Sequence, residues 1–199
     1  MIKIYGSKRS TSFRCIWLLE ELNVPYEIVE LDFTKGEHKS AEYLALNPNG
    51  KVPTMVDGGF VLWESLAINY YLMEKYNGIK FVGTTPEEHA MVNQWNLWAL
   101  LHLYEAFHPL VMQKYRGTPD SEATKASREE SIPRFLKVLE SNLADKEYVA
   151  LKTFSMADLT VMSVIKSADF VGYDLASYPN IGAWMRRVSE RPVYQKLMA

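Results

Sequence analysis

Cysteine is almost absent from this chain. Cys15 is the single cysteine among 199 residues, which excludes a disulfide within the chain and any cysteine-rich zinc site. Histidine is also scarce, and the four histidines show no metal-ligand spacing: His38, His89, His102 and His108. We therefore expect a protein that holds no metal.

Long apolar runs and an excess of charge are absent as well. No uninterrupted apolar stretch approaches the roughly 20 residues that a membrane-spanning helix needs. The first ten residues, MIKIYGSKRS, lack the apolar core of a secretory signal. A net charge of −2 gives no general attraction to nucleic acid or to an anionic membrane. We expect a soluble cytoplasmic protein that binds neither.

The first part of the chain alternates short strands with helices. Hydrophobic residues make up 48% of the sequence, which is enough for a core. Between residues 1 and 76 the pattern runs βαβ, a short helix, ββ and a final helix. The expected strands cover residues 2–5, 26–31, 52–56 and 60–62, and the expected helices cover 12–22, 40–46 and 64–76. This order predicts a small α/β domain.

The second part of the chain contains no convincing strand. Its expected helices cover residues 85–108, 122–143, 156–171, 181–190 and 193–197. Pro109 should break or kink the first of these, and Pro133 should bend the second. Glycine-containing turns enclose a short linker before them. We predict a first domain over residues 1–78, a linker over 79–86 and an all-helical domain over 87–199.

The segment Ser10-Thr11-Ser12-Phe13-Arg14 joins the first strand to the first helix. Unpaired N–H groups and the positive end of the helix dipole meet there, and both stabilise an anion such as a thiolate. A thioredoxin-like redox protein carries Cys-x-x-Cys at this turn, whereas this chain has Ser10 and Phe13 at those two positions. The Ser10 hydroxyl could instead donate a hydrogen bond to the sulfur of a bound molecule. The alternative is that Ser10 or Ser12 only caps the helix.

Two further segments have the chemistry of a peptide-binding site. A cis bond between Val52 and Pro53 would turn the Val52 backbone toward an extended peptide, whereas a trans bond would mark only a proline that begins an edge strand. Glu64 and Ser65 begin a helix, where a carboxylate suits an ammonium and a hydroxyl suits a carboxylate, unless they are ordinary caps. At one edge of a small sheet, the three segments fit a tripeptide-sized anionic thiol.

These segments carry a family resemblance. The stretches YGSKRSTSFRCIWLLEELNVPYEIVELD and EYLALNPNGKVPTMVDGGFVLWESLAI resemble the glutathione-binding domain of the cytosolic glutathione transferase superfamily. FSMADLTV and YPNIGAWMRRVSERPVYQKLM resemble the helical domain of that family. The resemblance covers essentially the whole chain. It implies a thioredoxin-like α/β domain followed by an all-α domain, in a serine-type, bacterial-like, cytoplasmic homodimer.

The resemblance also implies roles for particular residues. Ser10, four residues before Arg14, would be the catalytic hydroxyl. Val52 would pair through its backbone with the cysteinyl part of glutathione, in a loop whose following residue, Pro53, is preceded by a cis bond. Lys51 would lie near the glycyl carboxylate.

Three further assignments follow from the same resemblance. Lys39 is a second candidate for the charge at the glycyl end. Glu64 and Ser65 would hold the γ-glutamyl end. Ser155 and Asp158 match the internal capping box of the family, so we expect them to be structural.

The second substrate is expected to bind to the helical domain. Aromatic, histidine and methionine side chains on or just after its first long helix could line that pocket, although such a stripe is also typical of a core or a dimer interface. The candidates are Trp98, His102, Tyr104, Met112 and Tyr115.

Cys15 fits a cysteine-type enzyme poorly because it lies inside the first helix, and a small buried hydrophobic residue is the better interpretation. Arg9-Ser10-Thr11 only half resembles the Ser-Ser-Cys run of glutathione-dependent isomerases.

The sequence therefore predicts a glutathione transferase with glutathione as co-substrate. Bound glutathione would be activated as a thiolate that attacks a small hydrophobic electrophile. Lowering a thiol pKa from about 8.5 to about 6.5 requires roughly 2.7 kcal/mol, which two or three charge-assisted hydrogen bonds can supply. The alternatives are a glutathione-dependent isomerase or dehalogenase of the same fold, or a non-catalytic interaction module.

Overall fold

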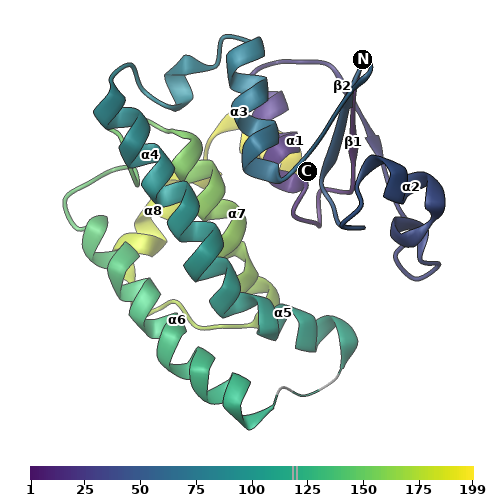
Figure 1. Cartoon of the computed structure of the whole chain (residues 1–199). Helices are drawn as coiled ribbons and strands as arrows, with labels where there is room; N and C mark the ends of the chain where they lie inside the picture. Colours follow the sequence, from purple (N-terminus) through teal and green to yellow (C-terminus); the bar gives the residue numbers. More distant parts are fainter. Residues whose placement is uncertain (118, 120) are drawn as a thin grey trace. The chain divides into compact units, whose positions relative to one another are not determined.

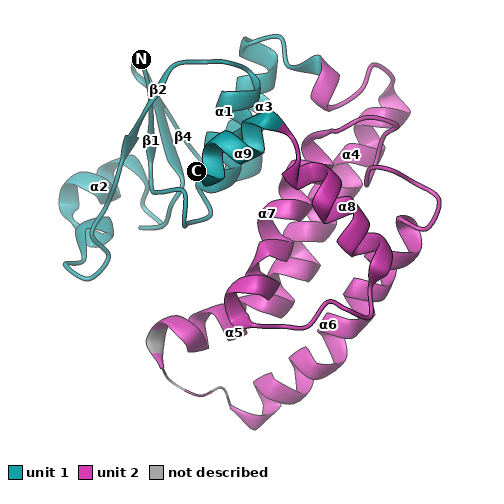
Figure 2. Ribbon diagram, turned by 180° about the vertical axis from the view of Figure 1, so that it is seen from behind, with its two compact units in different colours: residues 1–79, 192–199 teal, residues 80–191 magenta. Residues whose placement is uncertain are grey.

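The computed structural model describes residues 1–117, 119 and 121–199 (Figure 1). The chain divides into two compact units (Figure 2). Unit 1 comprises Met1–Ile79 together with Pro192–Ala199, and unit 2 comprises Lys80–Arg191. Each unit is built around its own buried apolar side chains.

Unit 1 contains a four-stranded mixed sheet in the order β2-β1-β3-β4. β1 (Ile2–Tyr5) runs parallel to β2 (Tyr26–Val29) and antiparallel to β3 (Thr54–Asp57), which pairs with the antiparallel β4 (Phe60–Trp63). Ile4 is fully buried and lies opposite Ile28 on one side and Met55 on the other. The two inner strands, β1 and β3, therefore carry the core of the sheet.

Helices cover both faces of this sheet. α1 (Phe13–Glu21) and α3 (Ser65–Lys75) pack against each other on one face. Figures 1 and 2 show α2 (Ala41–Leu46) on the opposite side, after the short 3₁₀ helix η1 (Glu37–Lys39). All the residues of α1 from Phe13 to Leu19 are buried, so this helix is a core element rather than a surface helix.

The C-terminal helix α9 (Pro192–Met198) belongs to unit 1. The ring of Tyr194 lies 4.9 Å from that of Trp17 and 6.4 Å from that of Phe13, and Lys196 pairs with Glu20 at 2.6 Å. These contacts attach the end of the chain to α1.

The described residues of unit 2 form helices and connecting loops, with no strand. Its elements are η2 (Ile79–Phe81, of which Ile79 falls in unit 1), α4 (Pro86–Trp98), the π-helical η3 (Ala99–Tyr104), α5 (Glu105–Arg116), α6 (Glu122–Asn142), α7 (Met156–Val171) and α8 (Pro179–Ser189). α7 packs against α4, η3, α5 and α8, and most of its residues are buried. It is therefore the central helix of the unit.

The expectation that Pro109 breaks its helix is wrong. α5 continues through Pro109 to Arg116 and ends at Gly117, which has a φ of 66°. A proline inside a helix costs about 3 kcal/mol or more. Ala106 and Phe107 are buried just before it, and burying an apolar side chain the size of Phe stabilises by about 1.5–3 kcal/mol. Packing of α5 against α7 thus offsets the missing hydrogen bond. α6 likewise continues through Pro133.

Candidate functional site

The Ser10 hydroxyl lies in the loop between β1 and α1, within a ring of backbone hydrogen bonds. Its Oγ accepts from the N–H of Ser7 at 3.1 Å and from the N–H of Ser12 at 3.2 Å. The hydroxyl donates to the Ser7 carbonyl at 2.9 Å, and that carbonyl also accepts the N–H of Ser10 at 3.1 Å. Two donated N–H bonds polarise the hydroxyl, and the Ser7 carbonyl keeps a partner if the hydroxyl proton turns to a ligand.

Ser12 does not cap α1 with its side chain, so that interpretation is wrong. Its hydroxyl is fully buried and donates to the Tyr5 carbonyl at 3.0 Å, at the end of β1. A Cβ atom at Gly6, which has a φ of +128°, would lie 1.9 Å from Ser12 Oγ. This position requires glycine, because any Cβ atom there would collide with the inward-pointing side chain of Ser12. Ser10, not Ser12, accepts an N–H at the start of the helix.

The Val52–Pro53 peptide is cis, as the sequence predicted. The loop around it is held by the Tyr43 hydroxyl, which donates to the Lys51 carbonyl at 2.7 Å, and by Asn47 Nδ2, which donates to the same oxygen at 2.8 Å. Burial raises the pKa of Tyr43, so its hydroxyl stays protonated. The Val52 carbonyl accepts from Thr11 Oγ1 at 2.7 Å, which ties this loop to the Ser10 loop.

Lys39 and Lys51 lie on neighbouring segments, and both are exposed. Lys39 Nζ is 3.4 Å from the carbonyl oxygen of Asn49. Gly50 has a φ of +58°, and a Cβ atom there would lie 2.6 Å from Lys39 Nζ. The Lys39 ammonium therefore lies against the loop that carries Lys51, and this edge of the domain suits an anionic group.

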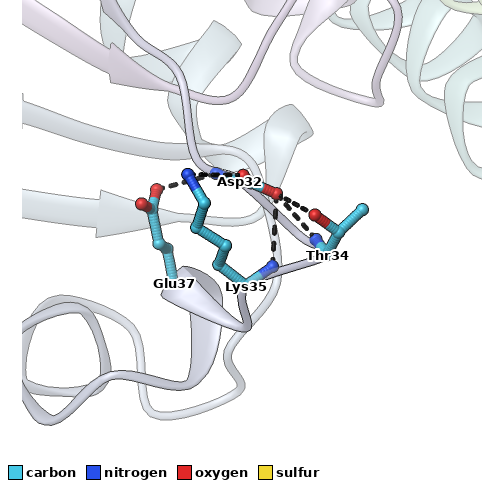
Figure 3. A network of polar contacts seen from close by, with 4 residues as sticks. All are labelled: Asp32, Thr34, Lys35 and Glu37. Atoms are coloured by element: carbon cyan, nitrogen blue, oxygen red, sulfur yellow. Dashed lines mark hydrogen bonds and ion pairs between the residues drawn. The ribbon is translucent and has the colours of Figure 1, made fainter.

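The segment before Lys39 is fixed by a polar network (Figure 3). Asp32 Oδ1 accepts from the N–H and the hydroxyl of Thr34 at 2.9 and 2.6 Å and from the N–H of Lys35 at 3.2 Å. Asp32 N–H in turn donates to Glu37 at 2.7 Å. Such side chain to backbone bonds define an Asx-type turn and lead directly into η1.

His38 is a candidate that the sequence pattern did not single out. Its ring lies 4.7 Å from that of Phe33, and its Nδ1 is buried without a hydrogen-bond partner among the described residues. It precedes Lys39 and belongs to η1. The only signal in the sequence was its position beside a lysine that had already been singled out.

Glu64 and Ser65 begin α3 in an unusual backbone conformation. Glu64 is exposed and has φ 72° and ψ 114°, and its side chain makes no capping hydrogen bond, so ordinary capping is not its role. Ser65 is 5% exposed, and its Oγ accepts from Arg14 Nη1 at 3.1 Å. A residue other than glycine held at positive φ is common at ligand sites because the surrounding structure enforces the strain.

Cys15 is buried in α1, as the sequence predicted. Its Sγ lies 3.6 Å from the Ser65 carbonyl oxygen. Burial raises the pKa of this thiol to about 12, so it is neutral at physiological pH and cannot act as a thiolate nucleophile.

The described contacts bring three of the predicted segments together within unit 1. Thr11 joins the Ser10 loop to Val52, and Arg14 joins α1 to Ser65. A hydroxyl, a loop that contains a cis-proline and a helix N-terminus are therefore neighbours. No group of three or more His, Cys, Asp or Glu side chains that could hold a metal ion occurs in the described part of the chain.

The five candidates for the second-substrate pocket do not gather at one place. Trp98 and His102 pack on Phe135 of α6, with ring centroids 6.3 and 5.3 Å apart. Tyr115 is 62% exposed and packs on Phe170 of α7. At about 1.5 Å per residue, Trp98 and Tyr115 are roughly 25 Å apart along their helices. The two remaining candidates, Tyr104 on η3 and Met112 on α5, are half-buried. The ring of Tyr104 packs on that of His108.

Ser155 and Asp158 have structural contacts at the start of α7. The N–H and the hydroxyl of Ser155 both donate to Asp158 Oδ2 at 2.9 Å. Asp158 Oδ1 accepts from the N–H of Val149 at 2.8 Å and from Trp184 Nε1 at 2.9 Å. One buried carboxylate thus organises a loop, a helix start and α8.

The fold and the site together define a class of protein. A four-stranded mixed sheet with a cis-proline loop before β3 and a helical second unit make a thioredoxin-like domain followed by an all-helical domain. The family model for the glutathione S-transferase N-terminal domain matches residues 2–74, and the model for the glutathione S-transferase C-terminal domain matches residues 104–197.

Full-length relatives agree with these matches. A probable glutathione S-transferase, GSTF2, of Oryza sativa subsp. japonica is 35% identical over 98% of this chain and 95% of its own length. Glutathione S-transferase GstB of Escherichia coli strain K12 is 31% identical over 100% of this chain and 98% of its own length. The crystal structure of glutathione transferase F2 from Populus trichocarpa superposes with a TM-score of 0.90 at 29% identity, covering 100% of this chain and 97% of that one.

This chain belongs to the glutathione S-transferase family and is a glutathione transferase. Its co-substrate is glutathione, as family membership implies. No helix in the described residues is long and apolar enough to cross a membrane.

Proposed function

We propose that this transferase is of the serine type and that Ser10 stabilises the glutathione thiolate. The observation that carries the proposal is the hydrogen bonding of the Ser10 hydroxyl, whose oxygen accepts the backbone N–H of Ser7, in the loop after β1, and that of Ser12, the N-cap residue of α1. Both bonds strengthen the hydroxyl as a donor, and the helix N-terminus favours negative charge nearby. Ser12 and Cys15 are fully buried and have other partners.

The anchors of the tripeptide are distributed over the rest of unit 1. Val52, next to Pro53, would pair with the cysteinyl backbone. Lys51 and Lys39 would attract the glycyl carboxylate, together with His38, whose buried Nδ1 can donate to an anion in the tautomer that carries its hydrogen there.

The opposite end of the ligand requires a different pair of residues. The exposed carboxylate of Glu64 would accept from the γ-glutamyl ammonium. The Ser65 hydroxyl and N–H, at the N-terminus of α3, would donate to the γ-glutamyl carboxylate. These contacts are the same before and during the reaction, so they serve binding rather than the chemical step.

The chemistry begins with loss of the thiol proton to solvent. The thiolate, held by the Ser10 hydroxyl, then donates an electron pair to an electrophilic carbon, and the bond from that carbon to its leaving group breaks. A small hydrophobic electrophile would lie against the helical unit, where the half-buried Tyr104 and Met112, about 12 Å apart along their helices, are candidates to contact it.

We also propose that two copies of the chain associate through α4 and η3. Leu97 and Leu101 are 52% and 63% exposed and stand four residues apart, on one side of the helix. Exposed apolar side chains that adjoin on one helix face are a feature of protein–protein interfaces.

Retention on immobilised glutathione together with turnover of a generic aryl halide tests the function. Retention and turnover are the expected results. Retention without aryl transfer, combined with turnover of a cis–trans isomerisation or dehalogenation substrate, would favour the isomerase or dehalogenase alternative. Failure to bind glutathione at all would contradict the proposal.

A further inference from the structure

Arg14 is a buried charge that the proposed chemistry does not use. It is the second residue of α1 and is only 5% exposed. Its Nη1 donates to Ser65 Oγ at 3.1 Å, and its backbone carbonyl accepts from Asn69 Nδ2 at 3.4 Å. A guanidinium is seldom buried without a specific anionic or polar partner because its desolvation is costly. Ser65 Oγ is one such partner of Arg14.

The hydrogen bond from Arg14 determines what the Ser65 hydroxyl can do. A serine hydroxyl has one proton to donate and lone pairs that accept. A guanidinium only donates, so it occupies a lone pair of Ser65 Oγ and leaves the proton for another acceptor. A positive charge at 3.1 Å also polarises the hydroxyl and makes it a stronger donor. The best acceptor for such a hydroxyl is an anion.

Cys15, the residue after Arg14, contacts the backbone of the same serine. Cys15 Sγ, protonated because of its burial, lies 3.6 Å from the Ser65 carbonyl oxygen and can donate to it. Two consecutive residues of α1 thus contact the side chain and the backbone of the first residue of α3. Ser10 lies four residues before Arg14 in the loop that leads into the same helix. The first turn of α1 therefore links the thiol end of the site to its carboxylate end.

We propose that Arg14 is a positioning residue for recognition of the γ-glutamyl carboxylate. It directs the Ser65 hydroxyl proton toward that carboxylate and adds a favourable charge behind it. This inference rests on the proposed function. It predicts that Arg14 matters for one ligand group, the α-carboxylate of the γ-glutamyl residue, and not for the remainder of the tripeptide.

Two ligands that differ only in this group give the test. S-methylglutathione binds without reacting, and S-methyl-4-aminobutyryl-cysteinylglycine is the same molecule without the α-carboxylate. Titration calorimetry on the wild-type chain and Arg14→Gln should show S-methylglutathione losing about ten- to hundredfold in affinity, the range for a hydrogen bond to a charged group. The analogue should bind both proteins equally. Arg14→Lys keeps the charge but not the planar guanidinium, so its affinity for S-methylglutathione should lie between those of the wild type and Arg14→Gln.

Controls separate this role from a general loss of structure. Arg186→Gln removes the same charge from an exposed position on α8 and should change neither affinity. In a Ser65→Ala background, Arg14→Gln should cost no further affinity, because the hydroxyl that it positions is gone.

A measurement on the wild-type chain remains valid if Arg14→Gln fails to fold. With ¹⁵N-labelled arginine, the guanidinium resonances of Arg14 should shift when S-methylglutathione is added and stay in place with the analogue. The inference would be overturned if Arg14→Gln lost equal affinity for both ligands or lost affinity for neither. Equal shifts of the Arg14 resonances with both ligands, or no shift with either, would overturn it as well. Failure of S-methylglutathione to bind the wild-type chain would instead overturn the proposed function and this inference with it.

Discussion

Glu64 combines a strained backbone with an exposed carboxylate, and the two properties can be separated by mutation. Its φ of 72° is unfavourable for any residue with a Cβ, at a cost of about 1–3 kcal/mol. Glu64→Gly should remove that strain and, after the entropy that glycine loses on folding, stabilise the protein by about 1 kcal/mol. The same change removes the ammonium acceptor, so glutathione should bind more weakly. Thermal unfolding and calorimetry measure the two effects.

Glu64→Gln is the matched control, because it keeps the Cβ atom and the side-chain length but not the charge. It should weaken binding without raising the midpoint temperature. A glycine variant that is no more stable than the wild type would show that the strain is not present in solution.

Single residues were predictable from the sequence only where a motif set their chemistry. Ser10, Val52 and Ser65 could be proposed as ligand contacts because a loop, an X-Pro bond and a helix start have known properties. The inward turn of Ser12 could not be foreseen, because it depends on the close approach of Gly6. The contact between Arg14 and Ser65 joins residues 51 apart in sequence, and no local pattern contains that information.

Among the elements, the start of α7 depends on one side chain. Asp158 is fully buried and accepts four hydrogen bonds, from Val149, Ser155 (two) and Trp184. Asp158→Ala would leave several buried donors unpaired, at about 1–3 kcal/mol each. The free energy of unfolding from denaturant titration should fall by at least about 3 kcal/mol. Ser155→Ala, which removes one donor and keeps the carboxylate, should cost only about 1 kcal/mol.

The order of the elements could be predicted from periodicity and turn residues, but their ends could not. The strands and α-helices of the sheet domain lie close to where the pattern placed them, but η1 was not predicted and β2 ends two residues earlier than expected. β3 begins two residues later than expected because Pro53 has no N–H to donate to the ladder. The continuation of α5 through Pro109 reflects tertiary packing, which outweighs local propensity. The π-helical η3 has no signature in the sequence that would have revealed it.

On the scale of the whole molecule, association should depend on α4 and η3. The double variant Leu97→Glu with Leu101→Glu places two charges where the proposed interface requires apolar contact, so it should sediment as a monomer of 22.9 kDa. Val138→Glu, at a 44% exposed site on α6, is the control and should not change the mass. A wild-type chain that is already monomeric at micromolar concentration would refute the interface.

The pKa of the bound glutathione thiol tests the central claim most directly. The ultraviolet absorbance of the thiolate, titrated with pH in the glutathione complex, should give a pKa well below the value of about 8.5 for a free thiol. Ser10→Ala should raise this pKa and lower kcat at neutral pH, with part of the activity returning at alkaline pH, while glutathione affinity changes little. An unaltered thiol pKa in Ser10→Ala, or activity that survives this change but is lost in Cys15→Ser, would contradict the assignment of Ser10.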